Sequence, residues 1–221
     1  MSILVFAILS LIVPLILAVG IWIVQKDKFE MPMRFFTLYL ATSVVFEIIG
    51  YVFRKAGIPN AWRVDVFTLV EVYFFGFILY CVIKSTRLST LLKWSTVSWF
   101  VLYIILKIVD IEPFGMNTYN RYSRPIALLL LAILSCTTLV HLLTRNSYQM
   151  PKKTYLIWLC FGIMIYSVGN AMVYSNIPIV DQDILEAFKY IYHVLYIVTY
   201  ITFLAAVLLY FRQTKNLFKT D

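Results

Sequence analysis

The sequence predicts an all-α fold, a polytopic membrane protein that forms a seven-transmembrane-helix bundle as a single domain over residues 1–221. Hydrophobic residues make up 62% of the chain and charged residues only 14%, against about 25% charged in ordinary soluble domains. The apolar residues also gather into seven runs of roughly 20 residues, the length with which a helix crosses a bilayer. A membrane β-barrel would show short alternating segments instead. The predicted spans are 3–24, 35–53, 64–83, 94–111, 125–144, 154–175 and 185–211.

The first three spans are long apolar runs bounded by charged residues. The first lacks the basic start of a secretory signal and is too long for a signal's apolar core, so we expect it to remain as a membrane helix. Pro14 predicts a kink in it, because neighbouring helices can satisfy the freed carbonyl. The second and third spans carry one glutamate each, Glu47 and Glu71. These carboxyl groups fall well inside the spans.

The next three spans also carry polar residues toward one end. Lys107 and Asp110 close the fourth span, where they are spaced to neutralise each other on one helix face. Pro125 opens the fifth span, where its missing N–H costs nothing. The sixth span places Tyr166 and Asn170 four residues apart, on one face of a helix.

The last span carries a polar stripe. Glu186, Lys189, His193, Tyr196 and Tyr200 follow one another at intervals of three or four residues, so a helix stacks them on one side. Ionisable groups at membrane depth are expensive and usually face the bundle interior or a watery cavity. We therefore expect this stripe to face other helices and not lipid.

Basic residues near the span ends predict the orientation, because cytoplasmic connections carry the excess of Lys and Arg. One side has Lys26, Lys28, Arg34, Lys84, Arg87, Lys93, Arg145, Lys152, Lys153, Arg212, Lys215 and Lys219, and the other has Arg54, Lys55, Arg63, Arg121 and Arg124. We expect the N-terminus outside and the C-terminus in the cytoplasm. The net charge of +8 is spread over these short clusters, which suits the lipid bilayer as partner and not nucleic acid.

With that orientation the polar residues of five spans lie in the outer half of the bundle. A lone carboxylate costs about 2.5 to 3.5 kcal/mol at a helix centre, so Glu47 and Glu71 are expected to be protonated, paired or hydrated in a cavity. We predict an outward-facing polar cavity that binds a ligand or relays protons. Its predicted residues are Glu47, Glu71, Lys107, Asp110, Tyr166, Asn170, His193 and Tyr196.

Other site chemistries lack their residues. Cys81, Cys136 and Cys160 lie inside spans without metal-ligand spacing, so we read them as buried hydrophobes. The outline resembles the microbial rhodopsins, but the middle of the last span has no lysine for retinal. The zinc hydrolases of the ceramidase and adiponectin-receptor type need three histidines, and the chain has only His141 and His193. The signatures of G-protein-coupled receptors are missing too. We expect no catalytic residue, metal site or cofactor.

One weak resemblance remains. The run Trp158 to Tyr174, with Gly162, Tyr166 and Gly169, and the third span with Glu71 resemble those of small stand-alone seven-helix bacterial membrane proteins, most of which have no assigned function. The resemblance implies a bacterial inner (plasma) membrane and a receptor-like architecture. It assigns no site residue.

These observations favour a stand-alone membrane sensor or ligand-binding protein. It would take a small polar or amphipathic ligand from outside and pass a helix shift to a membrane or cytoplasmic signalling partner. The connections and tail are short, so we expect no attached soluble module. Three alternatives stay open: a proton- or cation-coupled transporter with Glu47, Glu71 and His193 as the relay, a lipid- or isoprenoid-modifying membrane enzyme with two carboxyls as acid and base, and a structural subunit of a membrane complex.

Overall fold

Seven α-helices form the part of the protein that the computed structural model describes, which is residues 3–26, 29–83, 86–113, 121–145, 154–176 and 182–217. Each of the seven is long and apolar enough to cross a membrane, which indicates an integral membrane protein. The predicted all-helical architecture, with seven helices of membrane-crossing length, is confirmed. The helices are α1 (Ile3–Gln25), α2 (Met31–Lys55), α3 (Trp62–Val82), α4 (Thr86–Ile108), α5 (Ser123–Arg145), α6 (Thr154–Asn176) and α7 (Gln182–Leu217).

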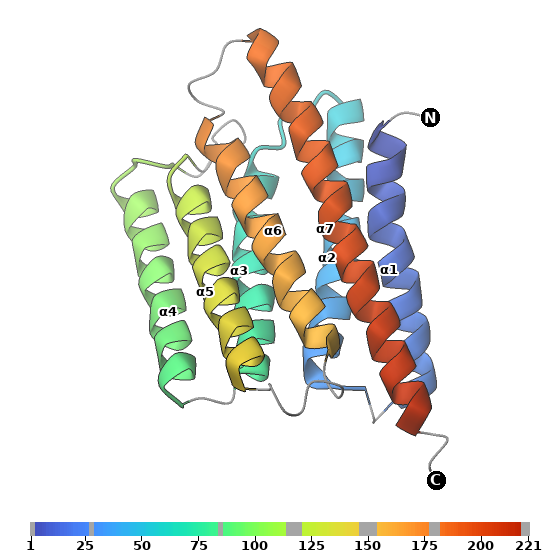
Figure 1. Ribbon diagram of the computed structural model, residues 1–221. Coiled ribbons are helices and arrows are strands. Elements are labelled where there is room, and N and C mark those ends of the chain that lie inside the picture. Colours follow the sequence, from blue (N-terminus) through green and yellow to red (C-terminus); the bar gives the residue numbers. More distant parts are fainter. Residues whose placement is uncertain are drawn as a thin grey trace.

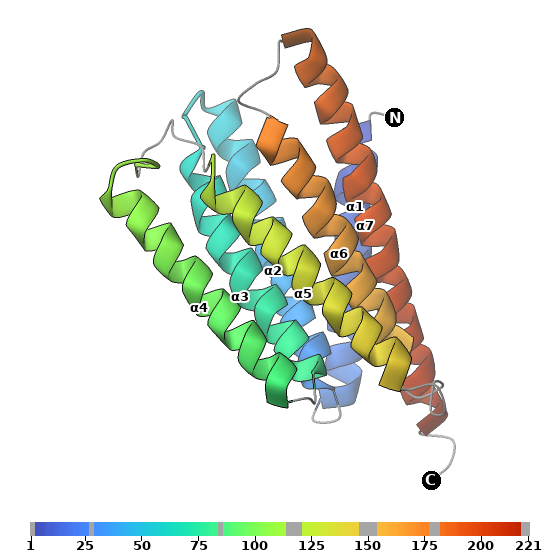
Figure 2. The same cartoon turned by 60° about the vertical axis from the view of Figure 1, so that its left-hand side comes forward.

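Two helices differ most from their predicted spans. α4 begins at Thr86 and not at residue 94, and α7 runs from Gln182 to Leu217 and not from 185 to 211. Both extra pieces are more polar than the spans they extend. An apolar run marks only the part of a helix suited to lipid, whereas backbone hydrogen bonding continues beyond that layer. In Figures 1 and 2, α7 accordingly reaches past the other helices at the upper end of the bundle.

α4 also ends earlier than predicted, at Ile108. Asp110 has a φ of 60°, and the amides of Ile111 and Glu112 both donate to the carbonyl of Leu106, each over 3.1 Å. This left-handed residue and the returning hydrogen bonds close the helix end. The chain therefore turns away before Asp110 can continue the helical face of Lys107.

Consecutive helices run in opposite directions (Figure 1), so one end of the bundle holds the starts of α1, α3, α5 and α7 and the ends of α2, α4 and α6. We call this the upper end. α1 packs against α2 and α7, α2 packs against α3, and α5 lies between α3 and α6, which packs against α7. α4 packs mainly on α3 and α5, and both Figure 1 and Figure 2 place it at the edge of the bundle.

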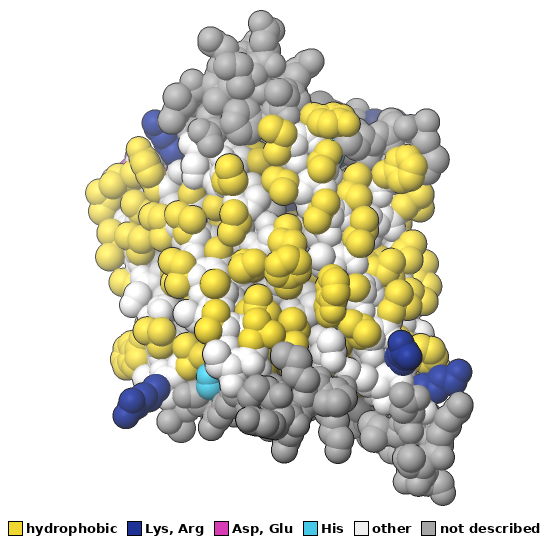
Figure 3. All heavy atoms as spheres, in the orientation of Figure 1, with side chains coloured by type: hydrophobic (Ala, Val, Ile, Leu, Met, Phe, Trp, Pro, Cys, Tyr) yellow, Lys and Arg dark blue, Asp and Glu magenta, His cyan; other side chains and the backbone are white. Residues whose placement is uncertain are grey.

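Apolar side chains cover the outside of the bundle. In Figure 3 they spread over the middle of the face in view, and Lys and Arg side chains appear toward its upper and lower edges. α4 turns Trp94 and Ile108 outward, and α1 turns Ile16 outward. Inside, Phe36 and Phe75 pack with Phe203 of α7. This surface suits lipid, while the aromatic interior holds the helices that carry the polar residues described next.

Candidate functional site

A buried ion pair joins three helices inside the bundle, below the upper end. Glu71 of α3 is fully buried, and Arg124 of α5 donates to both of its carboxylate oxygens, over 2.8 and 3.2 Å. Arg124 Nη1 also donates to Thr68 Oγ1 over 2.7 Å, and the Tyr166 hydroxyl of α6 donates to Glu71 Oε1. A two-pronged pair of this kind is the strongest form of side-chain hydrogen bonding. From the sequence, Glu71 was expected to be protonated, paired or hydrated, and the structure shows it paired with Arg124.

Arg124 is the partner that the sequence did not reveal. We counted it among the basic residues that set the orientation, but it is buried and its guanidinium lies 4.3 Å from the ring centroid of Tyr174. Its Nε has no hydrogen-bond partner among the described residues. Depth along the helices was no signal for this pair, because Arg124 is the second residue of α5 and Glu71 is the tenth of α3. The long Arg124 side chain reaches a carboxylate that lies deeper in the bundle.

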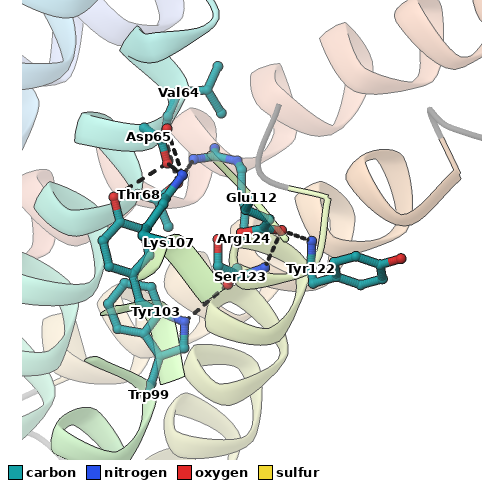
Figure 4. Close-up of polar contacts among 10 residues, drawn as sticks. All are labelled: Val64, Asp65, Thr68, Trp99, Tyr103, Lys107, Glu112, Tyr122, Ser123 and Arg124. Atoms are coloured by element: carbon teal, nitrogen blue, oxygen red, sulfur yellow. Dashed lines mark hydrogen bonds and ion pairs between the residues drawn. The ribbon is translucent and has the colours of Figure 1, made fainter. Parts of the chain in front are cut away.

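A second buried pair attaches α4 to α3. Lys107 Nζ lies 2.8 Å from Asp65 Oδ1 and 2.9 Å from Oδ2, and the Tyr103 hydroxyl is 3.4 Å from Asp65 Oδ1. Figure 4 shows Lys107 and Tyr103 both directed at Asp65. The spacing that favoured a pair between Lys107 and Asp110 was misleading, because α4 ends between them and Asp110 is exposed. Asp65 was not predicted as a site residue.

A third carboxylate holds the start of α5. Glu112 Oε1 accepts hydrogen bonds from the backbone N–H groups of Ser123, over 3.0 Å, and of Tyr122, and Trp99 Nε1 donates to the Ser123 carbonyl over 3.0 Å. Free N–H groups at a helix start favour a negative partner. Glu112 therefore acts as a helix cap from outside the helix and positions the neighbouring Arg124.

Glu112→Gln is expected to lower the free energy of unfolding by about 1 kcal/mol, because the amide keeps an acceptor but loses the charge at the helix start. Unfolding by sodium dodecyl sulfate in mixed micelles, followed by circular dichroism, measures it. The control is Asp110→Asn, which makes the same acid-to-amide change at an exposed position of the same connection. Equal losses in the two variants would contradict the capping role.

The largest cavity of the site is a groove of about 540 Å³ between α1, α2 and α7, here called the α1–α2–α7 groove. One wall is apolar and is formed by Ile8, Leu11 and Ile12 of α1 with Val44 and Ile48 of α2. The rest of the lining is polar and aromatic. It is formed by Glu47, Tyr51, Arg54, Arg63, Tyr174, Tyr192, His193 and Tyr196.

A smaller inner cavity of about 30 Å³ continues from this groove toward the centre of the bundle. It has room for about one or two waters. Its lining includes Arg124 and Tyr166 of the buried ion pair. The groove and the inner cavity share Glu47, Arg63, Tyr174, Tyr192 and Tyr196. Polar and aromatic side chains thus connect the surface of the bundle to Arg124.

Arg63 lies where the two cavities meet. Its Nη1 donates to the Phe46 carbonyl over 2.7 Å and lies 3.5 Å from Glu47 Oε2. A Cβ atom at position 50 would come within 2.2 Å of the same Nη1, so Gly50 leaves the space that the guanidinium occupies. From the sequence we expected Arg63 only to help set the orientation in the membrane. In the structure it also lines both cavities.

The structure brings together some of the eight predicted site residues and separates others. Glu47, His193 and Tyr196 line the groove, whereas Tyr166 lines the inner cavity and bonds Glu71. Asn170 is buried, with Nδ2 donating to the Tyr166 carbonyl over 2.8 Å. Lys107 and Asp110 lie at the end of α4, as described above.

Two further members of the α7 stripe, Glu186 and Lys189, have side chains outside the described residues. Sequence reasoning missed the apolar wall from α1, and also Tyr192 beside the predicted stripe. Within the described part of the chain, no three His, Cys, Asp or Glu side chains gather as a metal site.

No protein-family model, curated protein or solved structure matches this chain.

Proposed function

We propose that this protein is a membrane sensor that binds a small amphipathic molecule in the α1–α2–α7 groove. The observation that carries the proposal is the composition of that groove, in which apolar residues and polar or aromatic residues together line about 540 Å³. Small-molecule sites typically measure about 300 to 1,000 Å³ and combine apolar walls with a few polar groups that orient the ligand. A molecule with an apolar tail and a polar head matches both parts of the lining.

The edge of the groove favours entry from the membrane. Ile8, Ile48 and Tyr51 line the groove and are 45%, 57% and 60% exposed, so they also belong to the outer surface of the bundle. That surface is apolar and suited to lipid. A molecule dissolved in the bilayer therefore reaches the groove sideways, without crossing an aqueous path.

The contacts of α7 provide a route for a signal. At the upper end α7 forms one side of the groove. At the lower end Gln25 Nε2 of α1 donates to Thr214 Oγ1 over 2.6 Å, and the amide of Glu30, just before α2, donates to the Tyr210 hydroxyl over 2.9 Å. A ligand that changes the spacing of α1, α2 and α7 at the upper end would strain these contacts at the lower end. A partner protein bound at the lower end can respond to that shift.

The contacts of Glu71 count against a part for this residue in a proton or cation relay. A proton or cation relay needs a carboxyl group free to exchange its partner. Glu71 is engaged by Arg124 and Tyr166 at the same time. The groove, in contrast, needs no rearrangement of that pair to accept a ligand.

Filling the groove tests the proposal. In Ile12→Trp the indole occupies the apolar wall, and we expect the bound molecule to be lost. The matched control is Ile16→Trp, on the same helix at an outward-facing position that does not line the groove. Native mass spectrometry of protein purified in mild detergent, before and after incubation with a membrane lipid extract, reports what is bound.

The wild type and Ile16→Trp are expected to carry the same small molecule, and Ile12→Trp to carry none. An adduct that survives in Ile12→Trp places binding elsewhere and contradicts the proposal. A wild-type protein that acquires no molecule from the extract contradicts it as well. Proton flux in liposomes that depends on Glu47 would favour the carrier instead.

A further inference from the structure

We propose that the ligand of the α1–α2–α7 groove is a single-chain anionic amphiphile, with a carboxylate or phosphate head, and that Arg63 selects it by receiving that head. This inference rests on the proposed function and adds the chemistry of the ligand. Three observations support the inference: the charges of the groove, the contacts of Arg63 and the apolar residues of the lining.

The ionised side chains of the groove leave an excess of positive charge. Among the side chains that the structure describes, Arg54 and Arg63 line it against one carboxylate, Glu47. Arg124, which lines the inner cavity behind, is already matched by Glu71. The Arg63 side chain is only 20% exposed, so water and salt screen its charge less than they screen a charge on an open surface. An anionic head supplies the missing counter-charge, whereas a cationic head adds to the excess.

The bond that Arg63 makes with Glu47 is weak enough to exchange. The 3.5 Å separation exceeds the roughly 2.7 to 3.2 Å of a normal hydrogen bond, and the Glu47 side chain is 42% exposed. Among the described residues, the contacts of Arg63 with Phe46 and Glu47 both use Nη1. Nε and Nη2 therefore remain to bind two oxygens of a carboxylate or phosphate, the arrangement for which a guanidinium is shaped.

The lining and the volume of the groove indicate the tail and the size of the ligand. Leu11, Ile12 and Val44 offer an aliphatic surface for a tail, and Tyr192 and Tyr196 line the same groove as Arg63. The volume of about 540 Å³ is that of a site for one drug-sized molecule. A free single-chain amphiphile suits this space better than a two-chain phospholipid of the bilayer.

Gly50 provides a test that moves Arg63 without changing any charge. A Cβ atom there would overlap the guanidinium, with Nη1 at 2.2 Å and Cζ at 2.4 Å, and the end of a flexible side chain shifts readily. Gly50→Ala thus displaces the head-binding group and Arg63→Gln removes it. The matched control is Gly20→Ala on α1, where an added Cβ atom has nothing within 4 Å.

The experiment measures binding of radiolabelled laurate, dodecyl phosphate and dodecanol to the full protein in phosphatidylcholine nanodiscs. For the wild type and Gly20→Ala we expect both anions to bind at least about tenfold more tightly than dodecanol, as charge-assisted hydrogen bonds predict. Arg63→Gln and Gly50→Ala should lose about tenfold in affinity for the anions and keep their affinity for dodecanol.

Every other outcome contradicts the anionic head, the free amphiphile or the groove as a binding site. If all three probes bind equally to the wild type, or if Arg63→Gln and Gly50→Ala weaken all three alike, the anionic head is wrong while the groove remains a binding site. If none binds, or if binding survives Ile12→Trp, the proposed function itself fails. If phosphatidylglycerol placed in the nanodiscs displaces laurate, a bilayer lipid is the occupant and the free amphiphile is wrong.

Discussion

Glu71→Gln is expected to lower the free energy of unfolding by about 3 to 5 kcal/mol, the cost of leaving one member of a buried ion pair without its partner. Arg124 is fully enclosed and donates to both oxygens of Glu71. Glutamine keeps the shape of the side chain but removes the charge and turns a second set of donors toward the guanidinium. Loss of α5 packing against α3 follows, because the pair joins the start of α5 to the middle of α3.

The measurement is reversible unfolding by sodium dodecyl sulfate in mixed micelles, followed by circular dichroism. The double variant Glu71→Gln, Arg124→Met should recover most of the loss, since it removes both charges from the interior. Glu47→Gln is the control, because its carboxylate is partly exposed and 3.5 Å from Arg63, where a pair is worth about 1 kcal/mol at most. If Glu71→Gln proves as stable as Glu47→Gln, the buried pair does not hold the bundle together.

Asp65→Asn is expected to act locally, by releasing the end of α4. Lys107 loses the charge that balances it, whereas the amide oxygen of asparagine still accepts from the Tyr103 hydroxyl. Because α4 packs mainly on α3 and α5 at the edge of the bundle, we expect its last turns to open while the other helices hold. Amide hydrogen exchange there should accelerate about a hundredfold, or about 3 kcal/mol.

Hydrogen exchange followed by mass spectrometry resolves the two regions. α6, which lies between α5 and α7, serves as the internal reference and should keep its protection. Adding Lys107→Met to Asp65→Asn removes the unbalanced charge and should restore most of the protection of α4. A uniform acceleration over all helices would show that Asp65 supports the whole bundle and does not act as an attachment for one helix.

The partners of the buried charged residues could not be predicted from the sequence. Counting along a helix suggests partners three or four residues away, as for Lys107 and Asp110. In the structure Lys107 bonds a residue 42 positions away and Arg124 bonds one 53 positions away. Both pairs join different helices, and choosing them requires the rotation of each helix about its axis as well as its depth. Near-uniform hydrophobicity around a membrane helix gives little information on that rotation.

The residues of the groove were likewise only partly predictable from the sequence. Glu47, His193 and Tyr196 were predictable as cavity residues, because polar groups inside apolar spans avoid lipid. Ile8 and Ile12 were not, since an aliphatic residue that lines a cavity and one that faces lipid look alike in the sequence. Arg63 and Arg124 were assigned to orientation because a basic residue near a span end usually serves that purpose.

By itself, the sequence determined that this protein is a bundle of seven apolar helices whose polar residues concentrate toward one end. Apolar run length and the cost of charge in lipid are properties of single helices, and they require no knowledge of neighbours. Only the tertiary structure decided that Glu71 pairs with Arg124, that Asp65 holds α4 and that a groove opens between α1, α2 and α7. Those features depend on which helix faces meet, and that is set by packing over the whole bundle at once.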